Sequence, residues 1–195
     1  EALDIYKAND NLWGIARIHN DLGVTYERAG QVDSSLVHHR KALELRLQSN
    51  DSYNTFSSYL YIGDLLAEQG NITEAIEYYE NGLTYSDEVG FDVMVVDAHL
   101  KLGDYYLDAS RLEDARQEYL ISLELSQNIE DPTGISRANM ALAQIAILRG
   151  NYDEALVMLK TAEETMPESN LRMKEEMYKE ISDTYFKLGD YENAY

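Results

Sequence analysis

The chain has 195 residues, of which 45% are apolar and 27% charged, and its formal net charge is −20. The apolar content excludes a wholly disordered chain, and the absence of cysteine excludes a disulfide framework, cysteine-based zinc sites and a cysteine nucleophile. No stretch approaches the roughly 20 apolar residues of a membrane-spanning helix, so we expect an acidic globular module.

The negative charge is concentrated in one long segment. Residues 47–100 contain ten acidic residues and no lysine or arginine. Proteins bind nucleic acids and anionic lipids through lysine and arginine, so this segment argues against both kinds of partner. Two interpretations remain: a solvated acidic surface that keeps the protein soluble, or a groove that attracts basic ligands.

A period of 40 residues organises the whole chain. Small residues let two helices approach closely, and glycine readily adopts the left-handed conformation that ends many helices. Each cycle is therefore predicted to be a helix, a tight turn, a second helix and a connector. The small-residue column is Gly23, Gly63, Gly103, Ala143 and Ser182, and the turn column is Gly30, Gly70, Ser110, Gly150 and Gly189.

Apolar residues at helical spacing between these columns predict ten helices in chain order. We call the helix that carries the small-residue column the first helix of its pair, and the helix after the turn the second. Pro132 fits the start of the helix at 133–149, because its fixed φ suits the first helical turn. The predicted helices lie near 1–9, 13–29, 32–49, 52–69, 72–88, 91–109, 112–128, 133–149, 152–165 and 170–188.

These cycles resemble the tetratricopeptide repeat (TPR). The TPR pattern of Leu-Gly, Tyr, Ala and a later aromatic residue is legible in Leu22, Gly23 and Tyr26, in Leu102, Gly103 and Tyr106, and in Ala75 with Tyr79 and Ala115 with Tyr119. The common repeat has 34 residues, so the longer cycle implies longer helices, similar to TPR input regions of bacterial signalling proteins. The resemblance implies an all-α fold, a right-handed α-solenoid of antiparallel helix pairs known as the TPR superhelix.

The resemblance also predicts a single TPR array over residues 1–195. Neither terminal part looks like the polar cap that a repeat array needs, so we expect the chain to be a fragment of a longer protein. The parts are a second helix of a truncated repeat at 1–10, complete repeats at 13–50, 52–90, 91–130 and 133–168, and a truncated fifth repeat at 170–195.

The residues that could support catalysis do not converge. His19 and His99 occupy the same column two cycles apart, and the adjacent His38 and His39 point about 100° apart on one helix. Histidines in packing positions, no metal site, no cofactor and no enzymatic activity are therefore expected.

Most of the sixteen tyrosines are also expected to fill space between helices. Tyr61 lies off the packing columns and is a candidate for contact with a partner. The tyrosines assigned to packing are Tyr26, Tyr59, Tyr79, Tyr106, Tyr119, Tyr178 and Tyr185.

In the TPR family the first helices line a concave groove, and four-residue spacing indicates which side chains face it. Apolar residues alternating with the carboxylates of Asp64, Asp104 and Asp183 suit a basic or amphipathic segment. The alternative is that these aspartates only solvate the helix surface. The resemblance implies a peptide-binding groove formed by Asn20, Val24, Leu60, Tyr61, Asp64, Leu100, Lys101, Asp104, Met140, Gln144, Ile147, Lys179 and Asp183, with Leu107 and Phe186 beside them.

We therefore expect a non-catalytic scaffold that binds a protein or peptide in this groove. The resemblance suggests a regulatory input domain of a larger bacterial signalling protein. A self-assembly scaffold that stacks through its terminal repeats and a small-ligand sensor remain as alternatives. We expect no nucleic-acid binding, no direct membrane binding, and a cytoplasmic or, alternatively, periplasmic location.

Overall fold

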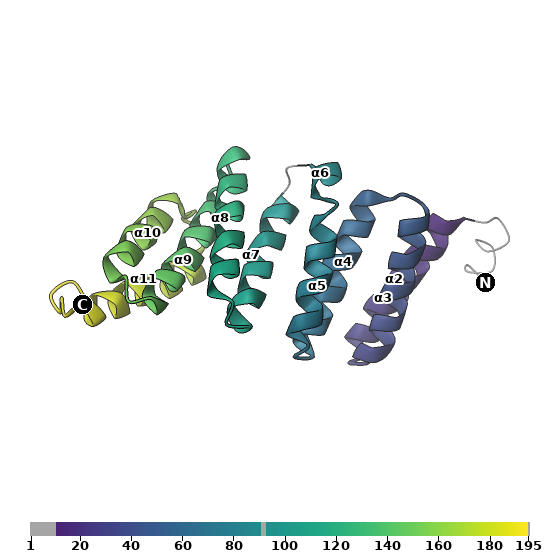
Figure 1. The fold of residues 1–195 in the computed structure, drawn as a ribbon, viewed down its shortest axis with the longest axis horizontal. Coiled ribbons are helices and arrows are strands. Elements are labelled where there is room, and N and C mark those ends of the chain that lie inside the picture. The colour runs from purple at the N-terminus through teal and green to yellow at the C-terminus, as the bar shows by residue number, and fades with distance from the viewer. Residues whose placement is uncertain (1–10, 91–92, 195) are drawn as a thin grey trace. The chain divides into compact units, whose positions relative to one another are not determined.

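The structure is a computed structural model that describes residues 11–90 and 93–194. Over these residues the chain forms ten α-helices and no β-strand (Figure 1). The helices are α2 (Leu12–Arg28), α3 (Val32–Gln48), α4 (Ser52–Glu68), α5 (Ile72–Leu83), α6 (Ser86–Val89), α7 (Val93–Asp108), α8 (Leu112–Asn128), α9 (Pro132–Leu148), α10 (Tyr152–Thr165) and α11 (Leu171–Leu188).

Eight of the predicted helices are confirmed, with bounds within two residues of the prediction. The helix predicted at 1–9 lies outside the described residues. Pro132 is the first residue of α9, as predicted, and the side chain of Asp131 caps that helix by accepting hydrogen bonds from the amides of Thr133 and Gly134, both at 3.0 Å.

The single helix predicted at 72–88 is wrong, because the structure divides it into α5 and α6. The segment between Asn81 and Ser86 is rich in residues that form helices poorly, including Gly82 and Thr84. The hydroxyl of Thr84 donates to the carbonyl of Asn81 at 2.7 Å, which gives the end of α5 a local hydrogen bond in place of helix continuation.

The predicted turn column is confirmed by its backbone conformation. All five turn residues have positive φ, including Ser110 at 60°, where a side chain other than glycine is uncommon. At Gly70, with φ 82°, the amide donates to the carbonyl of Ala67 at 2.8 Å, and the next amide, of Asn71, donates to Leu66 at 2.9 Å. These bonds satisfy carbonyls that the end of α4 would otherwise leave open.

The chain forms two compact units, Glu1–Gly90 and Phe91–Tyr195. In the first unit, α2 packs against α3, α3 against α4, and α4 against α5. In the second unit, α7 to α11 pack in sequence, and α7 also contacts α9. This last contact brings two first helices of the second unit together on one face.

Inside each helix pair the small-residue column lies against a bulky side chain of the second helix. A Cβ atom at Gly63 would lie 2.5 Å from Cδ2 of the Tyr79 ring, closer than real atoms approach. Gly103 is covered in the same way by Tyr119, and Gly23 by His39. Glycine is thus required where an aromatic or imidazole ring rests directly on the helix backbone.

The fourth pair makes this difference in volume smaller. It has Ala143 in place of glycine, and its second helix supplies Leu159 in place of a ring. Both side chains are fully buried and belong to one apolar cluster shared by α9, α10 and α11. The extra methyl group at position 143 accompanies a smaller partner, so the helix pair remains filled.

None of the helices in the described ranges is long and apolar enough to cross a membrane.

Candidate protein-binding site

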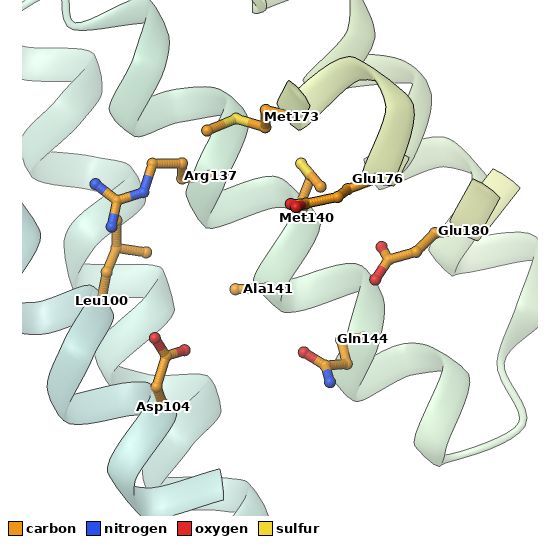
Figure 2. A pocket seen from close by; sticks show the side chains of 9 residues that line it. All are labelled: Leu100, Asp104, Arg137, Met140, Ala141, Gln144, Met173, Glu176 and Glu180. Atoms are coloured by element: carbon orange, nitrogen blue, oxygen red, sulfur yellow. The ribbon is translucent and has the colours of Figure 1, made fainter. Parts of the chain in front are cut away.

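The first helices of the second unit form an open cleft of about 290 Å³. Helices α7, α9 and α11 supply its lining, and Figure 2 shows acidic and methionine side chains gathered around Ala141. The lining residues are Leu100, Asp104, Arg137, Met140, Ala141, Gln144, Met173, Glu176 and Glu180. We refer to this feature as the α7–α9–α11 cleft.

Four of the predicted groove residues line this cleft: Leu100, Asp104, Met140 and Gln144. The expectation of an exposed Leu100 is wrong, because this side chain is only 3% exposed. Helix α9 packs against α7 and covers part of its surface.

The other predicted residues of the second unit do not line the cleft. Lys179 and Asp183 are exposed on α11, and Lys101 is half-buried on α7. Ile147 is half-buried and packs against the apolar cluster of α9, α10 and α11.

Sequence reasoning identified both lining residues of α7, but it missed part of the α9 flank and all of the α11 flank. The prediction followed one stripe along each first helix, but a cleft between neighbouring helices needs the facing flanks of both. Met140 and Gln144 share one flank of α9, and the flank of α11 that lines the cleft carries Met173, Glu176 and Glu180 instead of the predicted stripe. A second stripe, at three- and four-residue spacing, was the available signal for these residues.

Two of the three predicted acidic groove residues also have a structural role. The hydroxyl of Tyr79 donates to Oδ1 of Asp64 at 2.7 Å, and the hydroxyl of Tyr119 donates to Oδ1 of Asp104 at 2.8 Å. Each ring lies on the glycine that precedes the aspartate in the sequence, so the buried phenol reaches the carboxylate at the helix surface. His39 and Leu159, which take the place of the tyrosine in the other two pairs, have no such hydroxyl. The position of the aspartate in these pairs is occupied by Val24 and Gln144.

The cleft holds three carboxylates with unequal surroundings. Burial raises the pKa of the Asp104 carboxyl, and the hydrogen bond from Tyr119 and the charge of Arg137 oppose that effect. Burial also raises the pKa of Glu180, with further contributions from the negative charges of Glu176 and Asp183. The cation on this face, Arg137, forms an ion pair with Asp97.

Glu180 has one carboxylate oxygen without a partner. Its Oε2 atom is inaccessible to solvent and makes no hydrogen bond. A carboxylate oxygen in this position loses hydration without replacement, which is unfavourable unless a donor reaches it.

In the first unit, a tyrosine occupies the position that corresponds to Ala141. Tyr61 lies two periods earlier (141 − 61 = 80). Its ring centroid lies 4.8 Å from that of His39, and its hydroxyl donates to Oε2 of Glu27 at 3.1 Å. Tyr61 is still 40% exposed, which agrees with its place off the packing columns, and its contact with a partner stays a prediction.

The remaining predicted residues of the first unit are half-buried along the first helices. Asn20 and Val24 lie on α2, and Leu60 and Asp64 lie on α4.

The histidines take part in local contacts. His39 is buried against Gly23, as expected for a packing position. The Nδ1 atoms of His19 and His38 lie 3.0 Å apart, and the ring of His38 stacks on Tyr26. His99 lies in the second unit, with Nδ1 2.7 Å from Oε2 of Glu118. Within the described part of the chain, no group of three or more His, Asp or Glu residues could hold a metal ion.

Among the tyrosines assigned to packing, Tyr79, Tyr106 and Tyr119 are buried. The assignment of Tyr178 is wrong, because this side chain is 49% exposed on α11 and its hydroxyl donates to Oε1 of Glu163 at 3.0 Å.

Paired helices with a 40-residue period, a small residue against a bulky one in each pair, and a cleft on the first helices together define an all-α helical-repeat solenoid of the TPR class. The model of the MalT-like TPR region matches residues 1–184, and the chain belongs to this family. Proteins of this family and fold are typically non-catalytic scaffolds for protein interaction.

Solved structures show the same fold at low sequence identity. BtubC (BKLC) from P. vanneervenii has a TM-score of 0.82 at 18% identity, over 97% of this chain and 79% of that one. The MamA protein has a TM-score of 0.67 at 16% identity, over 92% and 85%. Pseudomonas aeruginosa PilF has a TM-score of 0.68 at 20% identity, over 92% and 71%.

Two curated relatives match part of the chain. Protein FLUORESCENT IN BLUE LIGHT, chloroplastic, from Arabidopsis thaliana is 33% identical over 99 residues, which are 49% of this chain and 30% of that protein. Outer dynein arm-docking complex subunit 4 from Danio rerio is 26% identical over 148 residues, 76% of this chain and 30% of that protein. The matched region is therefore about a third of each relative's length.

Proposed function

We propose that this protein is a non-catalytic scaffold that binds a basic or amphipathic segment of a partner protein on its first helices. The observation that carries the proposal is the α7–α9–α11 cleft, in which carboxylates and methionine side chains lie together on an open face. Methionine adapts its shape to varied apolar partners, and carboxylates favour cationic ones.

The charge of the whole chain supports a basic partner. The net charge is −20, and residues 47–100 carry no lysine or arginine. A field of this sign attracts cationic segments and repels nucleic acids and anionic lipid surfaces. The name of one relative, a docking-complex subunit, is consistent with a role in protein assembly.

In the same proposal, residues 1–195 act as one TPR array and as a regulatory input region of a larger bacterial signalling protein, in the cytoplasm or, alternatively, in the periplasm. The long-helix repeat supports this assignment by its similarity to such regions. The partner segment would bias the arrangement of the repeats, and the rest of the protein would respond to that bias.

A second candidate function is self-assembly, which is favoured by exposed apolar residues on α11. Leu171 is 70% exposed and Phe186 57% exposed. Apolar side chains of this size on one helix are typical of contact surfaces. Light scattering over a concentration series distinguishes the two functions, because an assembling scaffold gains mass with concentration and a monomeric receptor does not.

A selection of peptides from a random dodecapeptide phage library on the whole chain tests the scaffold function. We expect enriched peptides to combine basic and apolar residues and to lose binding to a variant with Gln144→Lys and Glu176→Lys. Both side chains are exposed in the cleft, so the substitutions reverse its charge without entering the core.

The matched control carries the same charge change on α8, with Gln117→Lys and Glu124→Lys, at two exposed positions of a second helix. Selected peptides should bind this control as they bind the unchanged protein. Peptides that bind the cleft variant and the control equally well would refute the proposed binding face.

A further inference from the structure

We propose that the α7–α9–α11 cleft is a recognition pocket for a single lysine side chain of the partner segment. This inference rests on the proposed function and adds to it the residue type that the cleft selects. The argument uses the apolar wall of the cleft, the directions of its carboxylates, the unpartnered oxygen of Glu180, and the origin of the open space.

The apolar part of the cleft suits the stem of a lysine. Met140 on α9 and Met173 on α11 lie at its upper side in Figure 2, and Leu100 lies on the α7 side. Lysine commonly lays its methylene groups along apolar surface while its ammonium group seeks polar partners. Flexible methionines adjust to such a stem.

The carboxylates suit the head of a lysine. In Figure 2 the carboxylates of Asp104, Glu176 and Glu180 point towards Ala141 from α7 on one side and α11 on the other. An ammonium group has three donors that diverge from one atom, whereas a guanidinium group is a flat fork that matches one carboxylate edge. Acceptors placed on opposite sides of one point therefore fit an ammonium group better.

The cation in the lining, Arg137, acts on the Asp104 carboxyl through its charge but forms its ion pair outside the cleft. That ion pair is with Asp97, which lies outside the lining. Tyr119 occupies only Oδ1 of Asp104, which leaves Oδ2 for another donor. The Oε2 atom of Glu180 is buried without any hydrogen bond. An incoming ammonium group would donate to Oδ2 of Asp104, and to Oε2 of Glu180 once that side chain turns, because this oxygen is closed to solvent in the structure. It would also reduce the repulsion between the carboxylates, of which Glu176 is already paired with Arg172.

The open space exists because position 141 is alanine. One period earlier in the same unit the chain has Lys101, and two periods earlier it has Tyr61. Both are large side chains on first helices of the same fold, so the repeat tolerates bulk at this position. Ala141 therefore leaves an open space at a position where these two repeats carry a large side chain.

The test uses methyl NMR of the whole chain labelled with ¹³C at the methionine methyl groups, with Nα-acetyl-lysine N-methylamide as the probe. We expect saturable shifts at Met140 and Met173, and much smaller ones at Met166 and Met177, which are buried in the apolar cluster against which Met140 and Met173 pack. The norleucine analogue, which lacks the charge, and the citrulline analogue, which keeps polar donors without charge, should leave all these signals unchanged.

Two substitutions connect the binding to the pocket. Glu180→Gln should weaken binding of the lysine probe about fivefold to tenfold, because it removes one charged acceptor. Ala141→Tyr should abolish binding by filling the space with a residue that the chain already carries at position 61. The control Glu175→Gln, at an exposed position of the same helix outside the lining, should bind the probe normally.

The same titration is made with Nα-acetyl-arginine N-methylamide. Three results would overturn the lysine pocket: no shift at Met140 and Met173, equal binding of the norleucine analogue, or tighter binding of the arginine compound. Unchanged binding by Glu180→Gln would also overturn it, without reliance on the bulkier variant. If library peptides still bind the first-helix face under these outcomes, the scaffold function stands and only the lysine pocket fails.

Discussion

Acidification should destabilise the first unit through His39. This side chain is 2% exposed, and its Nε2 atom has no hydrogen-bond partner. Burial, followed by the positive charge of Arg46 and the neighbouring His38, lowers the pKa of His39 from 6.5 to about 4. Between these two pH values the folded protein therefore holds a neutral imidazole, whereas the unfolded chain holds a protonated one.

The sign and size of the effect follow from proton binding. Between pH 6.5 and about 4 the unfolded chain binds a proton that the folded chain does not, so stability falls as the pH falls. The difference between the two pKa values corresponds to about 3 kcal/mol in total. About 2 kcal/mol of this is lost by pH 5, and above pH 6.5 the contribution is fully present.

Urea unfolding at pH 7 and pH 5 measures this loss. The chain contains one tryptophan, Trp13 on α2, so its fluorescence reports on the first unit. The control His39→Phe keeps a ring opposite Gly23, as Tyr79 does opposite Gly63, but cannot be protonated. We expect the unchanged protein to lose about 2 kcal/mol more than His39→Phe between the two pH values. Equal losses in the two proteins would refute the reasoning.

Three further predictions concern the packing of the helix pairs, each measured by urea unfolding. Tyr79→Phe should lose about 1–2 kcal/mol, because Asp64 loses a hydrogen bond; an unchanged midpoint would show that this bond contributes nothing. Gly63→Ala should lose about 1–3 kcal/mol, since its methyl group would enter the ring of Tyr79; a gain, as expected for alanine at an open helical site, would contradict the contact. Ala143→Gly, the reverse change, should also destabilise by about 1–2 kcal/mol, because it leaves space beside Leu159 and loosens the helix.

The helices could be predicted closely because their signals are local and repeated. A left-handed residue must end each first helix, and the chain supplies one at the same place in every cycle, Ser110 included. The break between α5 and α6 could not be seen by this method. A prediction from periodicity assigns the same helices to every cycle. This break depends instead on the weak helix formers around Gly82, which occur in one cycle.

The candidate site could be predicted only in part. Helical spacing identified Met140 and Gln144, but the flank of α11 that completes the cleft depends on how that helix is rotated against its neighbours. That rotation places Glu180 in the cleft and leaves Asp183 outside. The hydrogen bonds from Tyr79 to Asp64 and from Tyr119 to Asp104 join residues fifteen positions apart, so a reading of one helix at a time could not assign these aspartates.

The contact between the small residue and its ring has a consequence for how the chain reaches this structure. Gly63 and Tyr79 are 16 residues apart, as are Gly103 and Tyr119, so each decisive contact closes only one short loop (79 − 63 = 16). Short loops cost little entropy to close, and proteins dominated by such local contacts fold quickly. Each hairpin can therefore act as a local nucleus, from which the contacts with the next hairpin propagate.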